Sequence, residues 1–102
     1  MIPAVEERMD DLKRLCIRHD VQRLDLFGSA STDRYDSGES DLDFLVEFRP
    51  EALPIYADAY FGLLESLEQL FGKPVDLVVG SAIRNPYFLQ SVEKTRTPIY
   101  AS

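Results

Sequence analysis

Residues 28–46 read GSASTDRYDSGESDLDFLV, and the rest of the chain is predicted to hold this stretch in place. Asp41 and Asp43 stand at the start of its apolar end. Alternate side chains of a strand share a face, so both aspartates are expected opposite the face that packs into the core. Two carboxylates on one face repel each other unless a cation lies between them, and hard divalent ions such as Mg²⁺ prefer oxygen ligands. This end of the stretch therefore predicts a metal site.

The other end of the stretch, Gly28-Ser29, is a candidate phosphate-binding site. It follows a short apolar run and precedes a predicted helix N-terminus, where backbone N–H groups attract anions. Taken alone, the pair fits a plain turn with a helix cap better than a phosphate site. Ser40 is expected either to bind a phosphate or to orient Asp41, and Arg34 is a candidate phosphate-binding cation. A phosphate-binding site followed by Asp-x-Asp predicts nucleotide chemistry.

Hydrophobic periodicity in the flanking sequence predicts an α/β domain spanning residues 1–102. The predicted elements are a helix over 3–19, strands over 21–27 and 42–48, a helix over 54–71 that stops at Gly72, a strand over 75–79, a helix that starts at Asn85-Pro86, and an extended segment over 97–100. The order strand, helix, strand predicts a right-handed crossover and a parallel strand pair. That pairing would bring Asp76 beside Asp41 and Asp43.

Leu26–Ser29, reading LFGS, and Ser40–Val46, reading SDLDFLV, together resemble the minimal nucleotidyltransferases of the DNA polymerase β-like superfamily. Members of that family carry Gly-Ser, then a loop, then Asp-x-Asp, with a third carboxylate on a later strand. Residues 74–78, PVDLV, look like the later strand, and Asp76 looks like its carboxylate. The resemblance covers nearly the whole chain. It implies a small mixed β-sheet with helices mainly on one face, as in the polymerase β palm.

The motifs and the resemblance together define the candidate site. The expected catalytic and metal-binding residues are Asp41, Asp43 and Asp76, and the expected nucleotide-binding residues are Gly28, Ser29, Arg34 and Ser40. Mg²⁺, or Mn²⁺ in its place, is the expected cofactor and ATP the expected substrate. Two metal ions about 4 Å apart would activate the acceptor hydroxyl and hold the triphosphate. Asp76 is expected to ligate the metal nearer the acceptor.

The resemblance also implies a function for a chain of this size. Small free-standing members commonly act as antitoxins. They transfer AMP from ATP to a hydroxyl group of a helical HEPN toxin, and the expected acceptor here is a tyrosine. Residues 31–33, Ser-Thr-Asp, depart from the Arg-Gly or Thr-Gly that such proteins often carry after Gly-Ser. An acid there is unfavourable beside a triphosphate, which supports an alternative: a weak or inactive enzyme that neutralises its toxin by direct binding. A severed regulatory nucleotide-binding domain is a third possibility.

Composition restricts the partners and the compartment. A net charge of −7 argues against a nucleic-acid-binding surface and suits a basic protein partner in a hetero-oligomer. Cys16 is the only cysteine, so an internal disulfide is impossible and a reducing compartment is expected. No stretch approaches the roughly 20 apolar residues of a membrane span, and the N-terminus lacks a signal core. The sequence predicts a cytoplasmic protein that contacts neither membrane nor nucleic acid.

Overall fold

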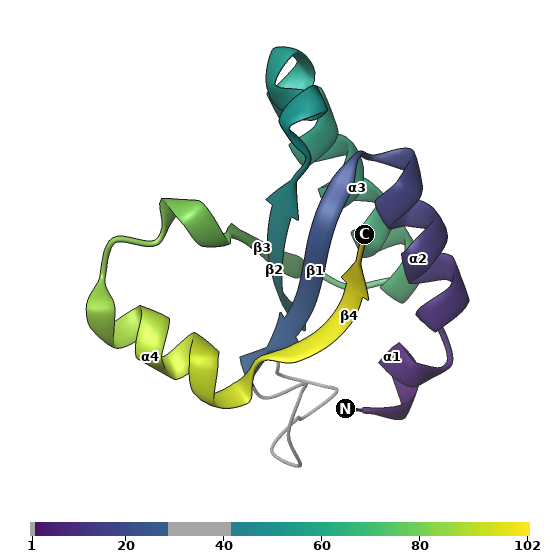
Figure 1. Cartoon of the computed structure of the whole chain (residues 1–102). Helices are drawn as coiled ribbons and strands as arrows, with labels where there is room; N and C mark the ends of the chain where they lie inside the picture. The colour runs from purple at the N-terminus through teal and green to yellow at the C-terminus, as the bar shows by residue number, and fades with distance from the viewer. Residues whose placement is uncertain (1, 29–41) are drawn as a thin grey trace.

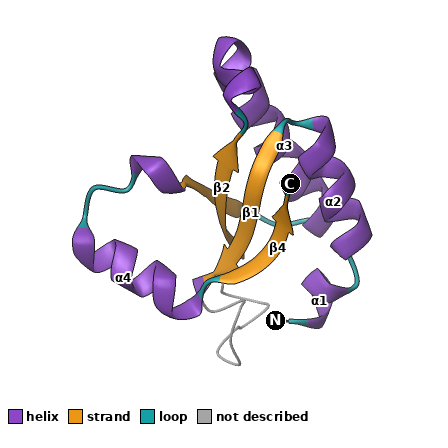
Figure 2. Ribbon diagram, in the orientation of Figure 1, coloured by secondary structure: helices purple, strands orange, loops and turns teal. Residues whose placement is uncertain are grey.

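The computed structural model describes residues 2–28 and 42–102 and shows a mixed four-stranded sheet with helices on both sides (Figures 1 and 2). Its elements in chain order are α1 (Pro3–Glu6), α2 (Met9–Arg18), β1 (Val21–Phe27), β2 (Leu42–Phe48), the 3-10 segment η2 (Pro50–Ile55), α3 (Tyr56–Phe71), β3 (Val75–Val79), the 3-10 segment η3 (Gly80–Ala82), α4 (Pro86–Thr95) and β4 (Thr97–Ala101). The strands lie in the order β3-β2-β1-β4. β1 is antiparallel to β2 and β4, whereas β2 and β3 are parallel. The predicted α/β fold is confirmed.

The main core lies between one face of the sheet and the helices α1, α2 and α3. Strand register places Leu24 beside Val46 and Leu26 beside Phe44, so the alternate residues of β1 and β2 form one apolar surface. Burial of each large side chain in such a core contributes about 1.5–3 kcal/mol. The side chains with no exposed surface in this cluster are Val5, Leu12, Cys16, Val21, Leu24, Leu26, Phe44, Val46, Leu63 and Leu67.

The opposite face of the sheet is covered in part by α4. Figure 1 shows α4 on the other side of the strands from α2 and α3. Val92 of α4 is buried against Phe27 and Leu45, and the ring of Phe88 meets that of Phe27 edge to face at 6.1 Å. The helices are therefore mainly on one face, as predicted. The part of this face that α4 leaves open carries the candidate site.

The helix predicted over residues 3–19 is divided into α1 and α2. The N–H of Arg8 donates to the carbonyl of Val5 at 3.0 Å, a bond over three residues that tightens the turn and ends the first helix. The break leaves both Val5 and Leu12 fully buried. The long helix also begins later than residue 54: Pro50–Ile55 forms the 3-10 segment η2, and α3 starts at Tyr56.

Two predicted helix boundaries are confirmed. Gly72 ends α3 with a φ of 67°, in the left-handed region that glycine adopts without strain. Asn85 begins α4, and its side-chain oxygen accepts hydrogen bonds from the N–H groups of Tyr87 at 2.9 Å and Phe88 at 3.3 Å. Within residues 2–28 and 42–102, no helix is long and apolar enough to cross a membrane.

Candidate active site

The parallel pairing of β2 with β3 sets two aspartates side by side. Asp43 of β2 is the register partner of Asp76 of β3. Residues directly opposite on adjacent strands point to the same face, which here is the face away from the main core. Asp43 is half-buried and Asp76 is exposed. Like charges in this arrangement destabilise the sheet unless a cation neutralises them.

Gly28 lies directly against Asp43. Its φ is +74°, and a Cβ atom at this position would lie 2.5 Å from Oδ2 of Asp43. Phe27, the preceding residue, is the register partner of Asp43, so the end of β1 is aligned with the carboxylate. Only glycine combines this conformation with so close an approach. The backbone at Gly28 and the carboxylate of Asp43 therefore form one continuous surface.

The structure brings together three of the predicted site residues: Gly28, Asp43 and Asp76. The other four predicted residues, Ser29, Arg34, Ser40 and Asp41, lie outside the described residues.

The donor atoms of the described residues fit part of a metal site. Asp43 and Asp76 offer carboxylate oxygens, which Mg²⁺ and Mn²⁺ prefer. Within residues 2–28 and 42–102, no group of three or more His, Cys, Asp or Glu side chains could hold a metal ion. A metal at the aspartate pair would therefore need further ligands from outside these described residues, such as water or a substrate phosphate.

A hydrogen bond from the far end of α4 holds Gly28. The Gly28 N–H donates to Oγ1 of Thr95 at 2.8 Å, and the Thr95 hydroxyl in turn donates to the carbonyl of Ser91 at 3.3 Å. Sequence reasoning missed Thr95, because a threonine near a helix C-terminus carries no signal that it will contact a strand far away in the sequence. The bond fixes the end of β1 relative to α4.

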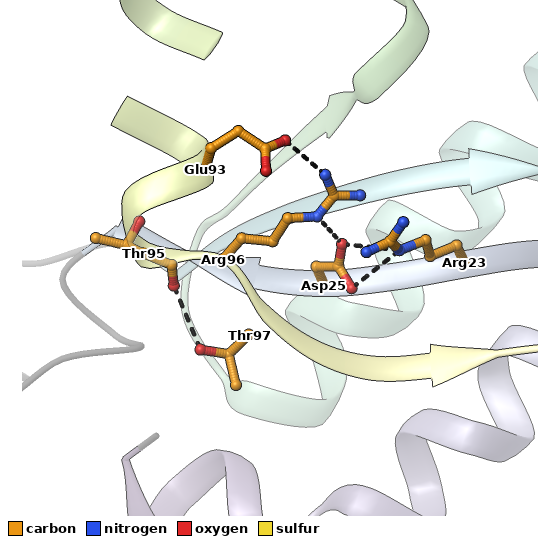
Figure 3. A network of polar contacts seen from close by, with 6 residues as sticks. All are labelled: Arg23, Asp25, Glu93, Thr95, Arg96 and Thr97. Carbon is orange, nitrogen blue, oxygen red and sulfur yellow. Dashed lines mark hydrogen bonds and ion pairs between the residues drawn. The ribbon is translucent and has the colours of Figure 1, made fainter. Parts of the chain in front are cut away.

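Next to this bond lies a buried carboxylate. The side chain of Asp25 has no exposed surface. Asp25 is the one buried polar or charged residue among those that the structure describes. Nε of Arg96 donates to Oδ2 of Asp25, while Arg23 lies 3.2 Å from the same oxygen (Figure 3). Arg96 also contacts Oε1 of Glu93 at 2.7 Å. Burial opposes the charge on Arg96, but the bonds to Asp25 and Glu93 outweigh it and raise the pKa of the guanidinium. The buried carboxylate is therefore neutralised by Arg96 from one side and Arg23 from the other.

An apolar groove of about 710 Å³ is lined in part by Leu77, Val78 and Val79 of β3. Its lining includes Tyr56 and Tyr60 of α3 and Phe88 of α4. The Tyr60 hydroxyl donates to the carbonyl of Leu77 at 2.6 Å. Burial raises the pKa of Tyr60, and the nearby charge of Asp76 adds to the shift. Tyr60 thus lines the groove and also lies close enough to Asp76 to feel its charge.

Comparison with known proteins identifies the family. The family model described as "Nucleotidyltransferase domain" matches residues 9–99. A Methanocaldococcus jannaschii protein named "Putative protein adenylyltransferase MJ1379" is 36% identical over 77 residues, which cover 76% of this chain and 75% of that protein. The chain therefore belongs to the nucleotidyltransferase domain family, as a minimal nucleotidyltransferase of the DNA polymerase β-like superfamily. The family predicted from the motifs is confirmed.

Solved structures show the same fold. One described as a "putative minimal nucleotidyltransferase" superposes with a TM-score of 0.73 at 29% identity, covering 92% of this chain and 91% of that one. A complex of a tri-AMPylated Shewanella oneidensis HEPN toxin with an MNT antitoxin contains a chain that superposes with a TM-score of 0.64. That chain is 20% identical, and the match covers 95% of this chain and 72% of that one.

Proposed function

We propose that this chain transfers AMP from ATP to a hydroxyl group of a partner protein and so acts as an antitoxin. The observation that carries the proposal is the pairing of Asp43 with Asp76 beside the close approach of Gly28. Nucleotidyl transfer requires little covalent chemistry from the protein, but it requires neutralised charge and reactants held in line. The described geometry supports both requirements within a nucleotidyltransferase fold.

The proposed ligand set is Asp41, Asp43 and Asp76, which would hold Mg²⁺ or Mn²⁺. A divalent ion there supplies positive charge to the triphosphate and the leaving pyrophosphate. Gly28 has no side chain and would let the phosphates approach its backbone closely, while its own N–H is bonded to Thr95. We assign phosphate contacts to the other predicted nucleotide-binding residues, which are Ser29, Arg34 and Ser40.

The proposed reaction is a single displacement at phosphorus. The acceptor oxygen attacks the α-phosphorus of ATP, the bond from that phosphorus to the bridging oxygen breaks, and pyrophosphate leaves. Asp76 is the exposed member of the pair, on the edge strand of the sheet, and we assign it the side nearer the acceptor. There its carboxylate would accept the hydroxyl proton. Asp43, which is half-buried against Gly28, would remain on the nucleotide side.

We propose a HEPN-type helical toxin as the partner, with a tyrosine as the acceptor, in a cytoplasmic hetero-oligomer. The similarity to an MNT antitoxin bound to an AMPylated HEPN toxin supports this assignment. The exposed apolar side chains of α4 also support a protein partner: Tyr87 is 79% exposed and Leu89 is 43% exposed. Exposed apolar patches of this kind mark protein interaction sites.

Direct binding without turnover is a second candidate function. The Ser-Thr-Asp sequence at residues 31–33 favours it, because an acid close to a triphosphate weakens nucleotide binding. In that case the same surface would cover the toxin, and the aspartates would not be required.

Transfer of label from ATP tests the proposal. The purified chain is incubated with Mg²⁺, ATP labelled at the α-phosphate and the protein encoded by the adjacent gene. We expect the label on a tyrosine of that protein, and no label when the γ-phosphate is labelled instead. Asp76→Asn should abolish the transfer, whereas Asp10→Asn, the same change at an exposed position of α2, should leave it intact.

Toxin neutralisation in cells separates the two candidate functions. If Asp76→Asn rescues growth of toxin-expressing cells as well as the wild type does, binding alone is sufficient. Loss of rescue by a variant that still forms the complex would support turnover.

A further inference from the structure

The junction between α4 and β4 is attached to β1 at two points, of which Figure 3 shows the contact between Arg96 and Asp25. Arg96 pairs with Asp25 in the middle of β1, and Thr95 accepts the N–H of Gly28 at its end. Thr95 and Arg96 are consecutive residues, so the two attachments act on one short segment of backbone. The position of this segment is consequently coupled to the position of Gly28.

The Arg96–Asp25 pair is the stronger of the two attachments. Asp25 is completely buried, and a buried carboxylate that loses its partner is left with an uncompensated charge. Glu93 holds the same guanidinium from the α4 side at 2.7 Å. Arg96 is thereby fixed between the helix and the strand, and its neighbour Thr95 has little freedom to move.

The Thr95 hydroxyl is oriented to accept. Its proton is donated to the carbonyl of Ser91, one turn earlier in α4. The oxygen lone pairs then face the N–H of Gly28, 2.8 Å away. Gly28 in turn leaves no room for a side chain between itself and Asp43. A contact that sets the position of Gly28 therefore also sets the distance between the backbone and the Asp43 carboxylate.

We propose that Thr95 is a positioning residue of the active site: its hydroxyl holds the backbone of Gly28 against Asp43, and the Arg96–Asp25 pair holds Thr95 in place. The inference rests on the proposed function, because it assumes that Gly28 lies beside the phosphates of bound ATP. In this proposal Thr95 acts through Gly28 rather than by contact with the nucleotide or the metal. Replacing Thr95 should change the affinity for nucleotide, because Thr95 sets the geometry of the phosphate-binding backbone before ATP binds.

The test replaces the hydroxyl with a methyl group in Thr95→Val and measures binding of the ATP analogue AMP-PNP with Mg²⁺ by calorimetry. Loss of one hydrogen bond predicts a Kd about 3- to 10-fold higher, with KM for ATP rising in parallel and kcat changing less. Thr95→Ser keeps the hydroxyl and should bind like the wild type. Thr97→Val is the matched control, because the Thr97 hydroxyl donates to the backbone carbonyl of Thr95 at 3.3 Å and not to Gly28.

The inference would be overturned if folded Thr95→Val bound AMP-PNP as tightly as the wild type. It would also be overturned if Thr97→Val weakened AMP-PNP binding as much as Thr95→Val does. Thr95→Ala removes the same hydroxyl without placing a methyl group against the N–H, and it replaces the valine variant if that protein does not fold. Failure of the wild type itself to bind AMP-PNP would overturn the proposed function, and the inference that rests on it.

Discussion

Replacing Gly28 with alanine should separate the stability of the fold from the geometry of the site. Gly28 has a φ of +74°, and the added Cβ would lie 2.5 Å from Oδ2 of Asp43. Alanine in the left-handed region costs roughly 1–2 kcal/mol. The contact is also about 1 Å shorter than the roughly 3.5 Å of an ordinary nonbonded contact, so the Asp43 carboxylate must move by about that amount.

Gly72 provides the matched control. It has a φ of +67°, nearly the same conformation, and a Cβ there would meet no atom of the described residues within 4 Å. Gly72→Ala should therefore carry the backbone cost alone, about 1–2 kcal/mol. In a domain of this size that cost lowers Tm by about 4–8 °C per kcal/mol. Gly28→Ala should show this loss and, in addition, a displaced carboxylate.

Denaturant unfolding and AMP transfer, measured on both variants, distinguish the two effects. We expect both variants to lose similar stability, whereas only Gly28→Ala loses transfer, by about 100-fold, because a displacement near 1 Å misplaces a reacting group. Equal activity in the two alanine variants would refute the placement of Gly28 at the active site. So would a fully active Gly28→Ala protein.

Three further predictions concern the scaffold. Burial raises the pKa of the Cys16 thiol to about 12, so a thiol reagent at neutral pH should modify the protein in denaturant but not in the native state; fast native modification would contradict this. Burial, and to a smaller extent the charge of Arg18, lower the pKa of His19 from 6.5. The unfolded chain therefore binds the proton more readily, and the free energy of unfolding should fall as the pH drops through about 6.5. His19→Gln should flatten that pH dependence in thermal melts, and an unchanged slope would assign it to other groups. Asn85→Ala should lower the free energy of unfolding by about 1 kcal/mol through loss of the α4 cap, and Asn85→Asp should not; an equal loss in both would argue against the cap.

The elements around the site could be predicted because their signals are local. The strands over residues 21–27, 42–48 and 75–79 agree with the prediction at both ends, since alternation and turn residues delimit them. The parallel pairing of the last two follows from the helix between them. The proximity of Asp76 to Asp43 was therefore predictable from the order of the elements.

Features that depend on distant residues were not predictable. Asp25 stands between Leu24 and Leu26, a pattern typical of a solvent-facing carboxylate, yet it is fully buried. Its burial depends on Arg96, which is 71 residues away in the sequence. The hydrogen bond between Thr95 and Gly28 was not predictable either. Many groups can accept the backbone N–H at the end of β1, and only the packing of α4 brings the Thr95 hydroxyl to it.

Binding of a divalent ion between Asp43 and Asp76 is the step on which the proposed chemistry depends, and thermal melts with and without millimolar Mn²⁺ measure it most directly. An ion that binds only the folded site should raise the Tm of the wild type by mass action. Asp43→Asn removes one of the two paired carboxylates, so its Tm should barely respond to Mn²⁺. Asp10→Asn should respond like the wild type. An equal Mn²⁺ shift in the wild type, Asp43→Asn and Asp10→Asn would contradict a metal site at this pair.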